Sequence, residues 1–314
     1  MIPTTTLPLD RLRSVFGGNM QTEVSLARYT AARVGGTADV LVVVNSVDEL
    51  AQTARELRTL EVPFLILGGG SNMLVSDTGV REVVILNRAR EISFDDESTP
   101  PTVWAGSGAN FGNVARRAAS RGLSGLEWAA GIPGTVGGAV FGNAGAHGDD
   151  VAGCLRMAEI LHQDGCKEQW SAEEMGYAYR SSRLKREKMA ATVLSASFAL
   201  EYSTPEEVQR QMDEFAAFRH RTQPPGASMG SMFKNPPEDY AGRLIEEAGL
   251  KGTRVGDAEI SQLHANFFIN HGEATAEDIF SLIEMARQTV AEKFDVALEL
   301  EIELIGDWKL DVGN

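Results

Sequence analysis

Residues 62–72 read VPFLILGGGSN, an apolar strand that runs directly into three glycines, a serine and an asparagine. Glycines at the end of a strand let several backbone N–H groups point at one place, and such a concavity binds anions such as phosphate. Ser71 and Asn72 add side-chain donors. Met73 stands where the dinucleotide fingerprint needs its third glycine, and no Lys-Ser/Thr pair completes a P-loop. Residues 68–72 therefore suit either a phosphate cradle or a tight surface turn.

Working outward from this stretch, strands and helices mix without a regular βαβ rhythm, which predicts the α+β class. Apolar or alternating runs predict strands at 40–44, 62–67, 83–86, 103–105, 158–162, 192–200, 264–270 and 296–305. Capping residues and apolar periodicity predict helices from a Ser46/Glu49 capping box to about 60, and at 110–121, 205–221, 240–248 and 275–294. The composition changes at Thr204-Pro205, so we expect domains at 1–203 and 204–314.

A second glycine-rich segment, residues 131–148, contains seven glycines. Such a segment is costly in chain entropy, so it makes sense where the backbone must approach a large flat ligand closely. A flexible loop is the simpler alternative, but Ile132, Pro133, Val136 and Val140 suit a loop that packs inside the protein. We expect this segment to be mostly loop, with one helical turn at most.

Composition and charge limit the function classes. The 314 residues include 43% apolar and 23% charged residues, which is typical of a globular protein of about two domains. With 29 basic and 44 acidic residues, the net charge is −15. A surface of this charge repels nucleic acids and anionic membranes, although one local basic pocket for a small phosphate ligand stays compatible with it.

The cysteines and the chain start add two expectations. Cys154 and Cys166 form no CxxC pair and no metal-ligand spacing, so we expect reduced thiols and no metal site. Residues 1–18 lack the apolar region of a signal peptide, and no apolar stretch is long enough for a membrane helix. These features predict a soluble, cytoplasmic protein that does not insert into membranes.

Three polar motifs lie farther along the chain. Arg180, in YRSS at 179–182, offers a planar cation for a carboxylate or phosphate, although by itself this pattern favours an ordinary surface arginine. Residues 230–236, GSMFKNP, place a hydroxyl, an ammonium and an amide on one short turn, as in a substrate-facing loop or a solvated turn. Residues 298–304, LELEIEL, alternate acids with apolar side chains, which by pattern alone favours an amphipathic strand. His264 begins a predicted strand and is the one histidine with a context that suits a site.

Taken together, these segments resemble one family. The matching motifs run in the family's order from about residue 28 to 306: YTAARVGG (29–36), GGGSN (68–72), PGTVGGA (133–139), NAGA (143–146), YRSS (179–182), GSMFKNP (230–236), AGRLIEEAGLKG (241–252) and HANFFIN (264–270). Each motif is weak alone, and the ordered set is similar to the MurB family, the UDP-N-acetylenolpyruvoylglucosamine reductases of bacterial peptidoglycan synthesis. The chain length resembles the compact type that lacks an extra substrate-capping segment.

The resemblance implies a fold and two cofactors. It implies a two-subdomain FAD-binding module of the vanillyl-alcohol-oxidase type, followed by a smaller α+β substrate domain whose last strand, about 296–306, contributes to the active site. NADPH would reduce FAD, and the enolpyruvyl substrate would then take up the hydride. The residues implied to bind FAD are Gly68, Gly69, Gly70, Ser71, Asn72, Gly131, Pro133, Gly134, Thr135, Gly137 and Gly138.

The resemblance also gives the polar motifs their roles. Arg180 and Glu301 would act on the substrate carboxylate, where negative charge develops after hydride addition. Ser231 would protonate the resulting enolate, since a hydroxyl held within hydrogen-bond reach can serve as the acid for so basic a carbon. The residues implied to contact the nucleotide sugar are Tyr179, Lys234, Asn235 and His264.

Two alternatives stay open at the level of the sequence. One is an oxidase on the same flavin module that uses oxygen as acceptor, and the other is a flavin- or nucleotide-sugar-binding protein without catalysis. The motifs YRSS and GSMFKNP argue against the oxidase, and Ser231, Arg180 and Glu301 argue against a non-catalytic protein. The chain departs from the family at Leu184, where an aromatic residue is usual, and in a loop before Ser231 that is one residue shorter.

Overall fold

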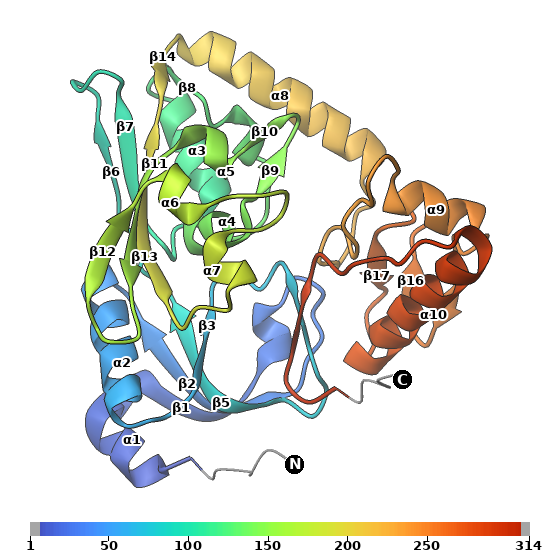
Figure 1. Ribbon diagram of the computed structural model, residues 1–314, viewed down its shortest axis with the longest axis horizontal. Coiled ribbons are helices and arrows are strands. Elements are labelled where there is room, and N and C mark those ends of the chain that lie inside the picture. Colours follow the sequence, from blue (N-terminus) through green and yellow to red (C-terminus); the bar gives the residue numbers. More distant parts are fainter. Residues whose placement is uncertain (1–6, 309–314) are drawn as a thin grey trace. The chain divides into compact units, whose positions relative to one another are not determined.

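The computed structural model describes residues 7–308, which divide into two compact units (Figure 1). Within the described residues, unit 1 comprises residues 7–20, Val42–Gly69 and Val84–Arg219. Unit 2 comprises Gln21–Leu41, Gly70–Val83 and residues 220–308. Neither unit is one continuous stretch of chain. The predicted division into 1–203 and 204–314 stays a prediction.

Unit 1 is built around a five-stranded antiparallel sheet of order β12-β11-β13-β7-β6. Its strands are β6 (Ile92–Asp95), β7 (Thr102–Gly106), β11 (Leu155–Leu161), β12 (Lys167–Trp170) and β13 (Thr192–Ala199). The helices α3 (Phe111–Ala119) and α4 (Val136–Gly142) share its core. Phe111 lies at the centre, 5.2 Å from the ring of Phe198 and 5.6 Å from that of Trp128, so aromatic packing joins the helices to the sheet.

A second sheet has the order β1-β2-β5-β3. It contains β1 (Met20–Ser25), β2 (Thr37–Val44), β3 (Phe64–Leu67) and β5 (Val80–Asn87). Unit 1 also contains α1 (Leu9–Phe16), η1 (Gly17–Asn19), α2 (Val47–Thr59), β8 (Leu123–Ser124), η3 (Glu127–Ala129), β9 (Gly145–Ala146), β10 (Asp149–Asp150), α5 (Val151–Cys154), α6 (Ala172–Met175), α7 (Arg183–Arg186) and β14 (Glu201–Tyr202), with most of α8 (Pro205–Thr222).

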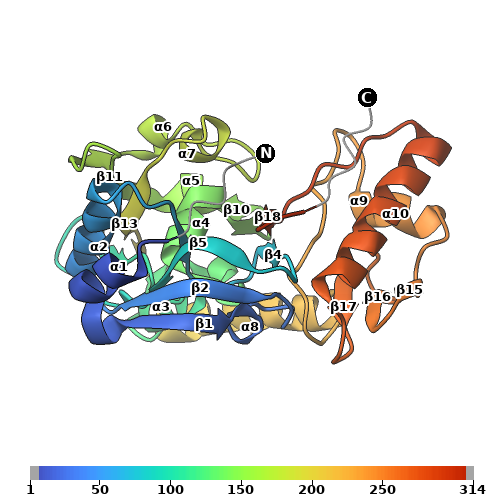
Figure 2. The same cartoon turned by 90° about the horizontal axis from the view of Figure 1, so that it is seen from below.

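Unit 2 packs two helices against a small antiparallel sheet. The strands β15 (Arg254–Val255), β16 (Ala258–Ile260) and β17 (Phe268–Asn270) share a core with α9 (Ala241–Glu247) and α10 (Ala276–Phe294). Figure 2 shows α10 beside this sheet. The unit also contains η2 (Leu26–Tyr29) and the parallel pair β4 (Met73–Val75) and β18 (Glu303–Ile305).

Long-range hydrogen bonds tie the three segments of unit 2 together. The Asp77 carboxylate accepts the N–H groups of Ala276 and Glu277, each at 3.0 Å, at the start of α10. A carboxylate at this end also complements the helix dipole. The Asn270 amide donates to the carbonyl of Ala32 at 2.9 Å. These bonds attach residues 21–41 and 70–83 to the C-terminal part of the chain.

The α+β class is confirmed, and the predicted helices at 110–121, 205–221, 240–248 and 275–294 all form within a few residues of the predicted bounds. Three local predictions were wrong. The glycine-rich segment contains the two-turn helix α4, because Val136, Ala139 and Val140 bury their side chains in the core. The strand predicted at 264–270 is limited to Phe268–Asn270, and the strand predicted at 296–305 to Glu303–Ile305. In both, the preceding residues pair irregularly with the loop that carries Ser231.

Candidate functional site

The two glycine-rich segments of unit 1 lie against each other. A Cβ atom on Gly68 would lie 2.5 Å from Thr135 Oγ1, and one on Gly69 would lie 2.8 Å from the Cα of Gly134. Real Cβ atoms do not approach other atoms this closely, so only glycine allows the contact. The exit of β3 and the start of α4, predicted as two separate features, therefore form one surface.

Helix α4 has one packed face and one open face. A Cβ on Gly137 would lie 2.8 Å from Cβ of Ser107, whereas one on Gly138 would find its nearest neighbour at 3.8 Å, and one on Gly142 would find none within 4 Å. Gly138 is exposed, as are the neighbouring Gly131 and Pro133. The open face therefore presents bare backbone, which fits a flat group that must lie close to the chain.

Arg180 lies on a turn that is fastened to the end of α4. Ser182 Oγ donates to the Phe141 carbonyl at 2.6 Å, and the Asn143 amide donates to the Ala178 carbonyl at 3.2 Å. Arg180 itself has a left-handed backbone with φ of 53°, which is uncommon for a side chain of its kind. Its guanidinium lies 5.5 Å from the ring centre of Tyr179, which is exposed. The surroundings thus hold the arginine in an unusual conformation.

Gly70, Ser71 and Asn72 belong to unit 2, where they lead into β4. Gly70 has φ of 59°, and any Cβ there would collide with the Tyr29 carbonyl oxygen, so this position requires glycine. The Asn72 amide donates to the Glu301 carbonyl at 3.1 Å. Asn72 therefore meets the segment of the predicted acid Glu301.

The loop that carries Ser231 lies between two segments that are distant in the sequence. Ser231 forms a bridge with Phe267 on one side, and Phe233 forms a bridge with Leu300 on the other. The Met232 carbonyl accepts the Glu301 N–H at 2.8 Å. Unit 2 therefore brings together the backbones that carry three predicted site residues: Ser231, Glu301 and, in the turn before Phe267, His264.

Lys234 and Asn235, predicted to contact substrate, also make contacts within unit 2. The Lys234 side chain is partly buried and forms an ion pair with Glu299, and the Lys234 N–H donates to the Glu299 carbonyl at 2.9 Å. The Asn235 side-chain oxygen accepts the Ala241 N–H at 3.1 Å, at the start of α9. Both side chains therefore make contacts that stabilise the fold of unit 2, in addition to the substrate contacts predicted for them.

His264 lies in a turn before β17 rather than at the start of a strand. Its Nδ1 accepts the Asn266 N–H at 3.2 Å, which assigns the ring proton to Nε2. Burial lowers the pKa of His264, so the neutral ring is favoured near pH 7. A neutral His264 can donate one hydrogen bond from Nε2.

The sequence analysis did not single out Asn143 and Asn266, which are both buried. Asn143 has a left-handed backbone at the end of α4 and holds the Arg180 turn, while Asn266 holds the Ser231 loop. In the sequence, each of these asparagines stands among mostly small or apolar residues, in NAGA and in HANFFIN, and this pattern could have marked it as a buried polar residue. Such residues are buried only when their amides are hydrogen-bonded.

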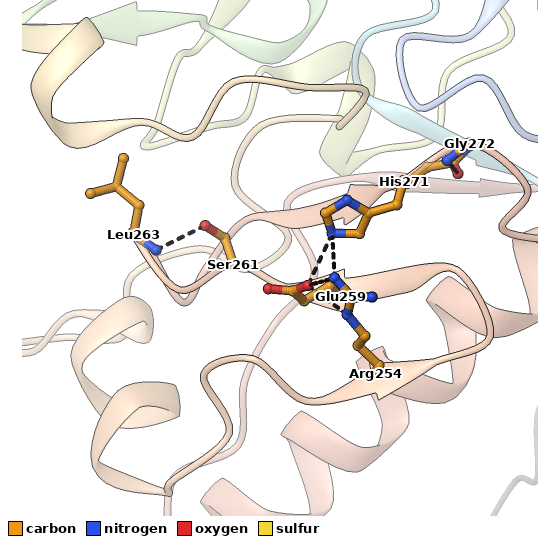
Figure 3. Close-up of polar contacts among 7 residues, drawn as sticks. Arg254, Glu259, Ser261, Leu263, His271 and Gly272 are labelled. Carbon is orange, nitrogen blue, oxygen red and sulfur yellow. Dashed lines mark hydrogen bonds and ion pairs between the residues drawn. The ribbon is translucent and has the colours of Figure 1, made fainter.

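A further polar cluster lies on the small sheet of unit 2, as Figure 3 shows. The buried Glu259 carboxylate on β16 forms ion pairs with Arg254 at 2.5 Å and with His271 Nε2 at 3.0 Å. Burial raises the pKa of Glu259, but the hydrogen bonds and charges of Arg254 and His271 outweigh it, so the net pKa is lowered. The three residues come from β15, β16 and the end of β17, so the cluster fastens the sheet.

Within residues 7–308 we find no group of three His, Cys, Asp or Glu side chains arranged for a metal ion. No helix of that part is long and apolar enough to cross a membrane. Cys154 and Cys166 are both free thiols. Burial raises the pKa of Cys154 to about 12, so this thiol stays protonated and unreactive.

Comparison with known proteins matches both parts of the chain. The family model for an FAD binding domain matches residues 38–166, and the one for the C-terminal domain of UDP-N-acetylenolpyruvoylglucosamine reductase matches residues 222–305. The reductase of Chloroflexus aggregans is 44% identical over 89% of this chain and 95% of its own length. The Bacillus subtilis reductase is 41% identical over 92% of this chain and 95% of its own length.

A solved structure agrees with this result. The crystal structure of the reductase (MurB) from Thermus caldophilus covers 91% of this chain and 100% of its own, with 40% identity and a TM-score of 0.77. Because sequence identity of this level extends over nearly the whole chain and the folds correspond, the chain belongs to the MurB family of UDP-N-acetylenolpyruvoylglucosamine reductases.

Proposed function

We propose that the protein reduces the enolpyruvyl group of UDP-N-acetylglucosamine enolpyruvate to give UDP-N-acetylmuramate, with NADPH as reductant and FAD as hydride carrier. The product is a precursor of peptidoglycan, so the reaction serves cell-wall synthesis. The observation that carries this proposal is the 40–44% identity to named reductases over about nine-tenths of the chain. The protein is thus an oxidoreductase and a flavoprotein that acts on a C=C bond of a small molecule.

The glycine surface of unit 1 supports FAD as the cofactor, because its bare backbone allows a flat ring system to approach closely. We propose that Gly68, Gly69 and residues 131–138 hold the cofactor, with further contacts from Gly70, Ser71 and Asn72. Held there, FAD would supply the transfer of a hydride from NADPH to the terminal vinyl carbon of the substrate.

The remaining chemistry falls to side chains of this protein. Hydride addition leaves an electron pair on the carbon next to the substrate carboxylate, delocalised into that carboxylate. We propose that Arg180 binds the carboxylate as a fixed cation, and that Glu301, sharing a proton, donates a hydrogen bond to it. The Ser231 hydroxyl then protonates the carbon and recovers its own proton from the medium.

We further propose that Tyr179, Lys234, Asn235 and His264 contact the nucleotide sugar. The neutral ring of His264, with its proton on Nε2, supports a donor role toward an oxygen of the substrate. The ammonium of the partly buried Lys234 side chain supports a role toward an anionic group, for which Glu299 would exchange partners. We also propose a cytoplasmic location, where NADPH and nucleotide sugars are available, which fractionation beside a cytoplasmic marker protein would test.

Anaerobic absorbance spectroscopy tests the proposed function. NADPH is expected to bleach the yellow flavin band of the purified holoprotein, and UDP-N-acetylglucosamine enolpyruvate is expected to restore it. Recovery only on adding oxygen would favour the oxidase instead. A protein that neither carries nor takes up FAD would contradict the proposal altogether.

A further inference from the structure

Asn266 hydrogen-bonds to the loop that carries Ser231 in the way that a residue of a neighbouring β-strand does. Its side chain is buried, and its Oδ1 accepts the Phe233 N–H at 2.9 Å while its Nδ2 donates to the Phe233 carbonyl at 2.8 Å. The Asn266 backbone carbonyl accepts the Met232 N–H at 2.8 Å. One residue therefore satisfies three backbone polar groups of Met232 and Phe233, as a neighbouring β-strand would.

Before Ser231, the loop is held by the backbone bridges of Ala227 with Asn270 and of Ser231 with Phe267, and Gly230 between them adds little constraint. Gly230, directly before Ser231, has φ of 78°, and a Cβ there would find no atom within 4 Å. Glycine with open space around it constrains its neighbours little. On the far side of Ser231, the backbone is fixed by Asn266 and by the Glu301 N–H bond to the Met232 carbonyl.

We infer that Asn266 is a positioning residue, whose carboxamide clamps the backbone of Phe233 and so holds the Ser231 hydroxyl at the point where it protonates the substrate. This inference rests on the function proposed above. Asn266 acts only by holding Ser231 in place, and we propose no contact between Asn266 and the substrate. A displacement of the proton donor of about 1 Å lowers the rate of such a step by about 100-fold.

Asn270 provides a matched control. It is buried in the same unit, four residues farther on, and its side chain is also fully hydrogen-bonded, with three bonds, to Ala32, Gly272 and Ala274. None of these partners belongs to residues 230–236. Replacing either asparagine with alanine removes its side-chain hydrogen bonds, two at Asn266 and three at Asn270, but only Asn266→Ala releases the Ser231 loop.

The test compares holoprotein carrying Asn266→Ala or Asn270→Ala with the wild type. For Asn266→Ala we expect the rate of flavin reoxidation by saturating enolpyruvyl substrate to fall by about 100-fold, while flavin reduction by NADPH and the substrate KM change little. For Asn270→Ala we expect a similar loss of thermal stability with reoxidation close to that of wild type. Equal losses of reoxidation in both variants would overturn the inference, because they would indicate a general structural effect.

A second variant, Asn266→Asp, gives a measurement that a general loss of stability would not change. Its carboxyl group, when protonated, can donate to the Phe233 carbonyl and accept from the Phe233 N–H, whereas the carboxylate repels that carbonyl. We expect the ratio of variant to wild-type reoxidation rates to rise as the pH falls. A ratio independent of pH would count against the clamp. If the wild type itself is not reoxidised by the substrate, the proposed function fails instead, and the two failures are distinguishable.

Discussion

At the scale of residues, carboxamides hold the segments that carry the predicted catalytic side chains. Asn143 donates to the Ala178 carbonyl beside Arg180, Asn72 donates to the Glu301 carbonyl, and Asn266 clamps the Ser231 loop. A carboxamide matches the donor and acceptor of a peptide group and carries no charge, so it can be buried against irregular backbone at a low desolvation cost. Irregular segments that no sheet completes are thereby kept in one conformation.

The predicted role of Ser231 gives a test at this scale. In Ser231→Ala we expect NADPH to reduce the flavin at the wild-type rate, because this step needs no proton from Ser231. Reoxidation by the enolpyruvyl substrate should fall by about 10²- to 10⁴-fold, the usual contribution of a positioned acid. Stopped-flow absorbance measures both steps. Ser228→Ala, in the same loop, is the control, and wild-type rates for both steps in Ser231→Ala would show that another group donates the proton.

At the scale of elements, α4 forms despite its sequence. Three of its seven residues are glycine, each of which costs about 1 kcal/mol of helix stability relative to alanine. Val136, Ala139 and Val140 offset this cost by burying their side chains in the core of unit 1. The glycines of α4 differ in their surroundings. A glycine that is packed against neighbouring atoms serves the fold, whereas one on the open face can lie against a ligand.

Alanine substitutions in α4 should distinguish the two faces. At Gly137 the added methyl group meets Ser107, so we expect a loss of about 1–3 kcal/mol in the unfolding free energy of the apoprotein. At Gly138 the methyl group meets only Thr135, at an ordinary van der Waals distance, so we expect the apoprotein to keep or gain stability while its affinity for FAD falls by about tenfold or more. Thermal melting of the apoprotein and titration with FAD measure these effects. Unchanged FAD affinity in Gly138→Ala would show that the cofactor lies elsewhere.

The Glu259 cluster predicts a pH dependence of stability. The pKa of Glu259 lies below its ordinary value of 4.5, so the folded state binds the proton less tightly than the unfolded state does. The stabilisation is therefore fully present above about pH 4.5 and is lost as the pH falls through the folded pKa. Denaturant unfolding of wild type and Glu259→Gln between pH 3 and 7 measures it. The difference in unfolding free energy should shrink with acid, and a constant difference would contradict the assigned pKa shift.

At the scale of the whole molecule, the core of unit 2 draws on three separate stretches of chain. Ala32, Val34 and Leu74 pack in the same buried cluster as Phe268 and Ile283. Asp77 caps α10 from almost 200 residues away. The C-terminal residues therefore complete their core with apolar side chains from the N-terminal part of the sequence.

This arrangement predicts the behaviour of a fragment. Residues 204–314 expressed alone lack Ala32, Val34 and Leu74, so we expect no cooperative thermal transition by circular dichroism, or one at a much lower temperature than in the full chain. Adding denaturant to the full chain provides the unfolded reference. A fragment that melts cooperatively close to the full chain would support the predicted boundary at residues 203 and 204 as a true domain limit.

Local signals explain which predictions succeeded. Ser46, Asn110, Thr204 and Thr275 each accept a backbone N–H at the start of a helix, and these capping bonds form between residues three apart. Because both partners of a capping bond lie within a few residues of each other, the start of such a helix can be predicted from the sequence before the fold is known. The two strand predictions that were too long, 264–270 and 296–305, depended instead on distant partners, and the partner in both cases was an irregular loop.

The sequence by itself determined the α+β class, the positions of the capped helices, the types of residue available for chemistry and, through its ordered motifs, the family. Only the tertiary structure decided that the Ser231 loop lies between the turn of His264 and the segment of Glu301, that α4 is a helix, and that Asn143 and Asn266 hold these segments in place. The physical reason is separation along the chain. Caps and apolar periods are satisfied by near neighbours, whereas these contacts join residues tens to hundreds of positions apart, and only packing of the whole chain brings them together.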